Sequence, residues 1–272
     1  MNKYTKLVNG TEIPMLGFGT WQIENEKSAI NSVKYALQIG YRHIDTAAAY
    51  NNEQYIAMGI KESGITRDEI FLTSKLWNSD QGYESTLKAF EKSLKKLDTD
   101  YLDLYLIHWP KGMKSIESWK AMEKLYSEGA IKAIGVSNFL QHHLEDFMAN
   151  IEILPMVDQL EFHPYLVQPE LLNFCKKHHI QYEAWSPLMR GEIMEIESLK
   201  KIAKKHERSI AQIVLRWDIQ MGVVTIPKSE HQDRIRENFQ IFDFELTEEE
   251  MKIITGLDRG KRTGPDPDNF NF

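Results

Sequence analysis

The chain has 272 residues, of which 42% are hydrophobic and 27% are charged, a composition typical of a globular protein with a sizeable core. Its formal net charge of −7 argues against a surface that binds nucleic acid or an anionic membrane, because both need clustered basic residues. The length matches one α/β barrel of about 250 residues. We therefore expect a single domain over residues 1–272 that acts on a small molecule.

The N-terminus and the cysteine content indicate where the protein works. Residues 1–14 contain no apolar stretch of signal-peptide length, and no uninterrupted apolar run in the chain approaches about 18 residues. Cys175 is the only cysteine, which excludes an intramolecular disulfide, and its helical surroundings favour a core position over a nucleophilic role. We expect a cytoplasmic monomer with no nucleic-acid or membrane partner.

The first predicted element is a β-hairpin in the segment KLVNGTEIP, residues 6–14. Its Asn9-Gly10 pair is the strongest short turn signal, because both residues tolerate the positive φ angles that tight hairpins require. We expect this hairpin to cover the N-terminal end, or bottom, of a barrel.

Eight short runs rich in β-branched and aromatic residues follow the hairpin, and each predicts a strand. In chain order they are residues 16–20, 41–45, 70–75, 102–108, 132–137, 156–161, 181–186 and 223–227. Amphipathic helix patterns lie between them; in residues 26–40, for example, Ala29, Val33 and Leu37 share one face. The alternation predicts a closed parallel (β/α)8 barrel, the TIM barrel, rather than an open doubly wound sheet.

Polar side chains stand at the ends of three successive predicted strands. These are Asp45, Lys75 and His108, and Tyr50 follows Asp45 by five residues. In a barrel of this kind, the C-terminal strand ends form one rim that carries the active site. A lysine cation would lower the pKa of the Tyr50 phenol from about 10, Asp45 would keep that lysine charged, and His108 could polarise a carbonyl oxygen. The set predicts a proton donor aimed at a developing oxyanion, and a cofactor must supply the hydride.

The later strand ends suggest a site for that cofactor. Lys228 and Ser229 precede a predicted helix that carries Arg234, and barrels often bind phosphate where such a helix begins. Trp185 could stack on a flat ring, and polar side chains on the intervening strand ends could bind a carboxamide. These are Ser137, Asn138 and Gln159. A nicotinamide dinucleotide fits this pattern.

The segments that carry these residues resemble the aldo-keto reductase family, in the right order and over nearly the whole chain. They are LGFGTW, GYRHIDTAAAYNNE, LTSKLW, LIHWP, IGVSNF, QLEFHPY, AWSPL and IPKS followed by RIRENF. The resemblance implies a (β/α)8 enzyme that reduces small aldehydes and ketones with NADPH. It is greatest to bacterial members similar to glyoxal or methylglyoxal reductase and 2,5-diketo-D-gluconate reductase. Such enzymes act on small carbonyl substrates, among them dicarbonyls, keto sugars and aromatic aldehydes.

The resemblance also implies residue roles. Asp45, Tyr50, Lys75 and His108 match the family tetrad, with Tyr50 as the general acid. The implied cofactor contacts are Thr20, Trp21, Asp45, Ser137, Asn138, Gln159, Trp185, Ser186, Leu188, Pro227, Lys228, Ser229, Arg234, Glu237 and Asn238. In that set, Lys228, Ser229 and Arg234 correspond to the 2′-phosphate site, and Glu237 and Asn238 to positions near the adenine. The implied substrate-binding residues are Trp21, Tyr50, Trp77, His108 and Trp109.

Two departures from the family pattern narrow the substrate. Many members stack a tyrosine under the nicotinamide, whereas this chain has Trp185, as in the bacterial members named above. The C-terminal segment GPDPDNFNF is short and resembles bacterial members, which argues against the steroid pockets that long loops form in animal relatives.

Two other functions stay open at this point. A barrel isomerase or aldolase could use Lys75 as a base or Schiff-base lysine and the loop at Lys228 to hold a substrate phosphate. A nicotinamide-sensing module with little turnover would keep the cofactor site without the chemistry. GFGTWQ lacks the third glycine of a Rossmann fingerprint, so the dinucleotide prediction depends on the barrel.

The histidines outside the proposed site show no metal-binding spacing. His142 and His143 are adjacent, as are His178 and His179, and adjacent helical residues are expected to point apart. His43 lies in a strand, and His163 in EFHPY is interpreted as a packed loop residue. We expect no metal.

Overall fold

The computed structural model describes residues 3–272. The predicted hairpin is present as the antiparallel strands β1 (Tyr4–Lys6) and β2 (Glu12–Pro14). At its turn the Asn9 side chain donates a hydrogen bond of 2.9 Å to the Lys132 carbonyl, just before β7 (Ile134–Ser137). The hairpin therefore lies at the N-terminal end of the barrel, as expected.

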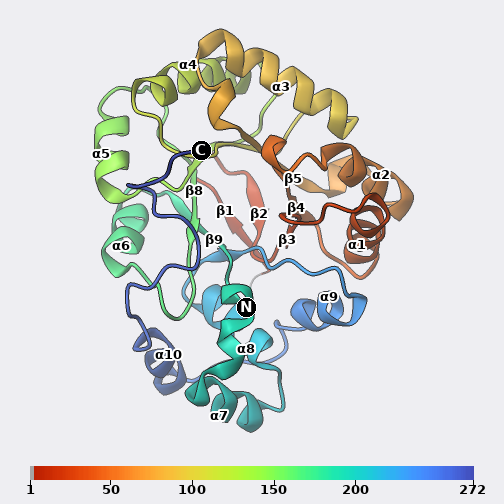
Figure 1. Ribbon diagram of the computed structural model, residues 1–272, viewed down its shortest axis with the longest axis vertical. Coiled ribbons are helices and arrows are strands. Elements are labelled where there is room, and N and C mark those ends of the chain that lie inside the picture. The colour runs from red at the N-terminus through yellow and green to blue at the C-terminus, as the bar shows by residue number, and fades with distance from the viewer. Residues whose placement is uncertain (1–2) are drawn as a thin grey trace.

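Eight parallel strands form one sheet in chain order. They are β3 (Phe18–Gly19), β4 (His43–Asp45), β5 (Phe71–Leu76), β6 (Leu104–Ile107), β7, β8 (Val157–Glu161), β9 (Gln181–Trp185) and β10 (Val224–Thr225). The first and last strands meet, because the Gly17 amide donates to the Thr225 carbonyl at 2.9 Å and the Thr225 amide donates to the Met15 carbonyl at 2.9 Å. The predicted closed (β/α)8 barrel is confirmed (Figure 1).

The two closing strands are shorter than predicted, and two glycines lie where they meet. A β-carbon on Gly19 would lie 2.8 Å from the Ile226 carbonyl oxygen, and one on Gly17 would lie 2.7 Å from the His43 ring. Only glycine fits such an approach, and a strand interior rich in glycine forms fewer regular ladder pairs. The predicted runs 16–20 and 223–227 thus join partly through a single bridge, Leu16 to Thr225.

Helices surround the strands on the outside of the barrel (Figure 1). They are α1 (Glu26–Gln38), α2 (Glu53–Ser63), α3 (Tyr83–Leu97), α4 (Met113–Ser127), α5 (Gln141–Met148), α6 (Pro169–Lys177), α7 (Glu197–His206), α8 (Ile210–Gln220), α9 (Gln232–Phe239) and α10 (Glu248–Thr255). Short 3₁₀ turns lie at η1 (Ala48–Tyr50), η2 (Arg67–Glu69), η3 (Asn78–Asp80) and η4 (Met189–Glu195). None of the helices within residues 3–272 combines the length and apolarity needed to cross a membrane.

Local sequence explains how the helices begin and which face they bury. The Asn25 side chain accepts the Ser28 amide at 3.0 Å and caps α1, which then buries the predicted stripe with Val33 and Leu37. Ser209 begins α8 in the same way, within a capping box. In these two helices, capping and the apolar stripe together fix the helix against the barrel.

The segment after α10 returns across the C-terminal end of the barrel (Figure 1). Glu161 Oε1 anchors it by accepting hydrogen bonds from the amides of Thr263 at 2.6 Å and Gly264 at 3.0 Å. The Asn78 side chain donates to the Phe272 carbonyl at 3.1 Å. The C-terminal segment therefore lies over the rim that the sequence predicts to hold the active site.

Candidate active site

An ion pair between neighbouring strands lies at the centre of the rim. Lys75 on β5 donates to Asp45 at the end of β4, with Nζ–Oδ1 and Nζ–Oδ2 distances of 2.6 and 2.8 Å, and to the Thr46 carbonyl at 3.0 Å. Lys75 is 0% exposed and Asp45 is 2% exposed. Burial lowers the pKa of Lys75, but the charges of Asp45 and Tyr50 raise it more, so the net pKa lies above its ordinary value. The ammonium is charged at neutral pH.

Tyr50 ends the turn η1, which the left-handed residue Asn51 terminates at φ 54°. Its hydroxyl lies 3.4 Å from Lys75 Nζ. Burial raises the pKa of Tyr50 and Lys75 lowers it, and the net pKa lies above the ordinary value of 10.0. Lys75 thus lowers the pKa of Tyr50, as expected, but the loss of water around the phenol raises that pKa by more. Tyr50 keeps its proton at neutral pH.

His108 follows β6 and packs edge-on against Tyr50, with ring centroids 5.8 Å apart. Burial and the charge of Lys75 hold the pKa of His108 well below its usual value, so the imidazole is neutral. Its Nδ1 has no hydrogen-bond partner among the described residues. A neutral imidazole here can donate one hydrogen bond to a substrate oxygen.

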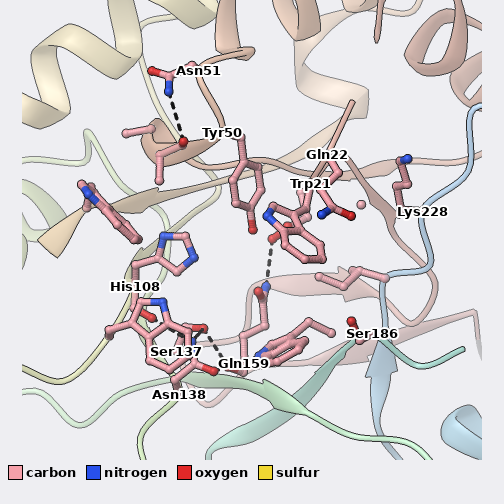
Figure 2. Close-up of a pocket in the computed structure, with 18 of the residues that line it drawn as sticks. Trp21, Gln22, Tyr50, Asn51, His108, Ser137, Asn138, Gln159, Ser186 and Lys228 are labelled. Atoms are coloured by element: carbon pink, nitrogen blue, oxygen red, sulfur yellow. Dashed lines mark hydrogen bonds between the residues drawn. The ribbon is translucent and has the colours of Figure 1, made fainter. Parts of the chain in front are cut away.

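The polar side chains predicted to bind a carboxamide form the opposite wall (Figure 2). Asn138 donates from Nδ2 to the His108 carbonyl at 2.9 Å and to Ser137 Oγ at 3.0 Å, and its Oδ1 accepts Trp185 Nε1 at 2.9 Å. Both amide hydrogens of Asn138 are thus in use. Gln159 Nε2 donates to Asp45 Oδ2 at 2.8 Å and to a second carboxylate at 3.0 Å. The Gln159 oxygen is the carboxamide partner that this wall leaves available.

One cavity of about 830 Å³ joins most of the predicted residues. Its lining includes Trp21, Asp45, Tyr50, Trp77, His108, Trp109, Ser137, Asn138, Gln159, Trp185, Ser186, Leu188, Pro227 and Lys228. Figure 2 shows His108 at one end of this group and Lys228 at the other. The predicted residues outside its lining are Thr20, Lys75, Ser229, Arg234, Glu237 and Asn238. Lys75 lies behind Tyr50, and Thr20 donates its hydroxyl to the Asp45 carbonyl at 2.9 Å.

The sequence prediction missed several residues that line the cavity. Phe272 stacks on Trp77, with centroids 5.7 Å apart and an interplanar angle of 6°. Arg190 lies over the Trp21 ring at 5.0 Å and also lines the cavity. The two phenylalanines in the C-terminal segment NFNF could have indicated an aromatic wall. Arg190 lies in a loop with no recognisable motif, so the sequence did not indicate its position at the cavity.

Glu230, which binds Lys228 from outside the lining of the cavity, was also missed. Lys228 donates to Glu230 Oε1 at 2.8 Å, and Ser28 of α1 donates to Oε2. These two hydrogen bonds lower the pKa of Glu230, so it is a carboxylate at neutral pH. Arg234, on α9, is exposed. A phosphate that binds Lys228 would therefore share its ammonium group with an acidic side chain.

The expectation that His142 and His143 point apart is wrong. Their rings lie 4.1 Å apart, and their Nε2 atoms lie 2.8 and 3.2 Å from Asp268 Oδ1. His143 Nδ1 accepts the Leu140 amide at 3.2 Å, so in the neutral ring Nε2 carries the proton and cannot ligate a metal. The three side chains fasten the C-terminal segment to α5.

A family model described as the aldo/keto reductase family matches residues 15–259. The chain belongs to the aldo-keto reductase family. Among curated aldo-keto reductase relatives, glyoxal reductase of Bacillus subtilis (strain 168) is 57% identical over 98% of this chain and 97% of its own length. Methylglyoxal reductase DkgA of Escherichia coli (strain K12) is 44% identical over 97% of each chain.

Solved aldo-keto reductase structures share the fold closely. An enzyme from a Medee basin deep-sea metagenome library has a TM-score of 0.96 and 50% identity, covering 98% of this chain and 100% of that one. A mutant of Gox0644 solved in complex with NADPH has a TM-score of 0.94 and 41% identity, covering 99% and 98%. The family assignment therefore agrees with the barrel and with the rim on which the tetrad residues meet.

Proposed function

We propose that this protein is an NADPH-dependent reductase of small aldehydes and ketones, with 2-oxoaldehydes such as methylglyoxal as its preferred class. The observation that carries this function is a protonated phenol, Tyr50, which lines a cavity of about 830 Å³ and lies 3.4 Å from a buried lysine cation. Family membership supports the same chemistry.

The chain's own residues supply the proton. When bound, NADPH supplies a hydride to the carbonyl carbon. Tyr50 gives its proton to the carbonyl oxygen as negative charge develops there, and Lys75 stabilises the phenolate that remains. Asp45 holds Lys75 as a cation, and the neutral His108 ring orients the same oxygen. One hydride and one proton convert the carbonyl to an alcohol.

The cavity suits the cofactor chemically. The Gln159 oxygen is free to accept from a carboxamide, and the Trp185 ring offers a flat face beside it, held by Asn138. Lys228 and Arg190 provide positive charge for phosphates. We propose that Ser229 and Arg234 complete the 2′-phosphate site and that Glu237 and Asn238, on the same helix α9, lie near the adenine.

The substrate end of the cavity favours small carbonyl compounds. Phe272 contacts both Trp77 and Trp109, and Trp21 lines the same cavity. These aromatic walls leave room for a short or flat substrate. The similarity to glyoxal and methylglyoxal reductases favours dicarbonyls within that class.

The isomerase or aldolase alternative receives no support from the geometry of Lys75. Its ammonium donates three short hydrogen bonds, to both Asp45 oxygens and the Thr46 carbonyl, and is fully buried. A Schiff-base lysine must be accessible and deprotonated to attack a carbonyl. Lys75 meets neither requirement.

The test is to follow NADPH oxidation against methylglyoxal, glyoxal, aromatic aldehydes and keto sugars, with a sensitive NADPH-binding measurement in parallel. We expect turnover of dicarbonyls that depends on Tyr50. Tight NADPH binding with negligible turnover across the whole panel would instead support the nicotinamide-sensing alternative.

The setting of the reaction is part of the same proposal. We propose that the protein is bacterial and acts as a monomeric single domain in the cytoplasm, where a charged dinucleotide such as NADPH is regenerated. Size-exclusion chromatography with light scattering would test the monomer, and a mass of twice 31.8 kDa would contradict it.

A further inference from the structure

Glu183 is a buried carboxyl group beside the site that the proposed reaction leaves without a role. It lies in the middle of β9 and is 0% exposed. Its Oε2 accepts from Gln159 Nε2 at 3.0 Å, and its Oε1 has no hydrogen-bond partner among the described residues. Burying an acid with an unpaired oxygen destabilises a fold, so its position next to the tetrad needs a reason.

The first consequence of Glu183 concerns the orientation of Gln159. The Gln159 amide nitrogen is shared between Asp45 Oδ2 at 2.8 Å and Glu183 Oε2 at 3.0 Å. Because Asp45 Oδ2 and Glu183 Oε2 both accept from the same nitrogen, and the unpaired Glu183 Oε1 can carry the proton when the group is neutral, the two acids define which end of the amide is nitrogen. The oxygen must then face the cavity. Without Glu183, one amide hydrogen would lose its partner and the amide could turn.

The second consequence concerns charge. The titratable groups that face Glu183 inside the barrel are His43 and Asp45 of β4, Lys75 of β5 and Tyr50 of η1. Burial lowers the pKa of His43 to about 3, so its 3.6 Å contact with Glu183 is not an ion pair. Lys75 is then the single cation facing two acids.

The charge of Glu183 changes within an accessible pH range. Burial and the neighbouring Asp45 raise the pKa of Glu183 to about 8. Below that pH the carboxyl group is neutral and still accepts the Gln159 hydrogen bond through its carbonyl oxygen. Above it, a second negative charge faces Lys75 and raises the pKa of Tyr50 further.

We propose that Glu183 is a positioning residue that holds the Gln159 amide for the nicotinamide carboxamide and that, when it is ionised, adds to the groups that weaken Tyr50 as an acid. The inference rests on the proposed function. A neutral Glu183 leaves Tyr50 the stronger acid and favours carbonyl reduction. An ionised Glu183 makes Tyr50 a weaker acid and slows the proton transfer that accompanies the hydride.

The deciding experiment compares wild-type protein with Glu183→Gln in single turnovers of bound NADPH with methylglyoxal, from about pH 6.5 to about pH 9. Glutamine keeps the acceptor for Gln159 but cannot ionise. A group with a pKa of about 8 is ionised in about nine molecules of ten at pH 9, so we expect the wild-type rate constant to fall several-fold. Tyr50 itself, with a pKa above 10, stays protonated over this range. For Glu183→Gln we expect a change below about twofold.

Two more variants separate orientation from packing. Glu183→Leu removes the acceptor as well as the charge, so we expect the Kd for NADPH to rise about tenfold, with near-recovery in Glu183→Gln. Asp218→Asn is the matched control, because Asp218 is also fully buried, but its Oδ2 accepts from Thr225 outside the proposed site. We expect Asp218→Asn to keep the wild-type pH profile, and thermal unfolding of each variant reports its stability.

If the single-turnover rate constant of Glu183→Gln fell between about pH 6.5 and about pH 9 as much as that of wild type, the proposed role of the Glu183 charge would be overturned. Unchanged NADPH affinity in Glu183→Leu would overturn the positioning role. These results differ from a failure of the proposed function. In that failure, wild-type protein would not oxidise NADPH with any carbonyl compound, or its rate would be no higher than that of Tyr50→Phe. In that case the role of Glu183 would be refuted with it.

Discussion

Asp45 and Lys75 form a buried ion pair, with Lys75 Nζ 2.6 Å from Asp45 Oδ1 and 2.8 Å from Oδ2. The two side chains come from neighbouring parallel strands, so the pair exists only once the barrel has formed. The same lysine lies 3.4 Å from the Tyr50 hydroxyl. The ion pair is therefore both part of the barrel interior and the electrostatic support for the proposed proton donor.

Replacement of Asp45 by Asn should impair stability and activity together. It leaves the Lys75 ammonium buried without a counter-charge, and breaking such a pair destabilises proteins by about 3–5 kcal/mol. Urea unfolding measures the first effect, and single-turnover reduction measures the second. Asp103→Asn is the control, because Asp103 pairs with the more exposed Lys132 and Arg67. A variant at Asp45 that kept wild-type stability and rate would refute the role of the pair.

The acidic residue at the phosphate end predicts how strongly the protein prefers NADPH. Glu230 holds Lys228 at 2.8 Å and would repel a 2′-phosphate. We expect Glu230→Ala to lower the KM for NADPH several-fold and to leave the KM for NADH nearly unchanged. Arg234→Ala should narrow the preference, whereas Arg236→Ala, whose guanidinium donates to Tyr35, should not. Equal effects on both coenzymes would contradict this assignment of the 2′-phosphate site.

Phe272 should affect the choice of substrate more than the chemistry. It stacks on Trp77 and contacts Trp109 edge-on. An aromatic contact contributes about 0.5–1.5 kcal/mol, so Phe272→Ala should raise the KM for an aromatic aldehyde several-fold and change that for glyoxal less. The neighbouring Asn271→Ala serves as control. If Phe272→Ala raised both KM values alike, the aromatic wall would not discriminate between substrates.

Acid stability should depend on Glu250, far from the site. Its carboxylate is buried, but hydrogen bonds from Lys205, the Thr247 amide and His206 lower its pKa to about 2. Because the folded pKa is below the unfolded value of about 4.3, the stabilisation is present above that pH and is lost as the pH falls toward 2. Glu250→Gln should thus be less stable than wild type at pH 6, with a difference that shrinks in acid.

Chemical denaturation at several pH values measures that difference. The exposed Glu249→Gln, in the same helix turn, should show no comparable pH dependence. If the free energy of unfolding of Glu250→Gln stayed below that of wild type by the same amount from pH 6 to pH 3, the side chain would stabilise the fold by packing rather than by charge.

The sequence predicted the barrel and the meeting of Asp45, Lys75 and His108 because both depend on local patterns and on one topological rule. Each strand is a short apolar run, and parallel barrel strands bring their C-terminal ends to one rim. The strand pattern alone does not predict that the barrel closes, because closure depends on Gly17 and Gly19, which allow β3 to approach β10.

The remaining features depend on three-dimensional context. The direction of the Tyr50 pKa shift follows from the loss of water around the phenol, which its sequence neighbours do not reveal. Phe272 reaches Trp77 because Glu161, Asn78 and the histidine contacts of Asp268 hold the returning C-terminal segment. In the sequence, Glu183 looks like an ordinary strand residue. Only the structure shows that Gln159 donates hydrogen bonds to both Glu183 and Asp45. Long-range contacts of this kind have no signal in a single sequence.

The most direct test of the proposed mechanism is single-turnover reduction of methylglyoxal by NADPH in wild-type protein and in Tyr50→Phe. Removing the proton donor while keeping the ring should lower the rate constant by about 10²–10⁴-fold with NADPH affinity nearly unchanged. Tyr126→Phe, remote from the cavity, should match wild type. A Tyr50→Phe variant that reduced methylglyoxal at the wild-type rate would contradict the assignment of Tyr50 as the general acid.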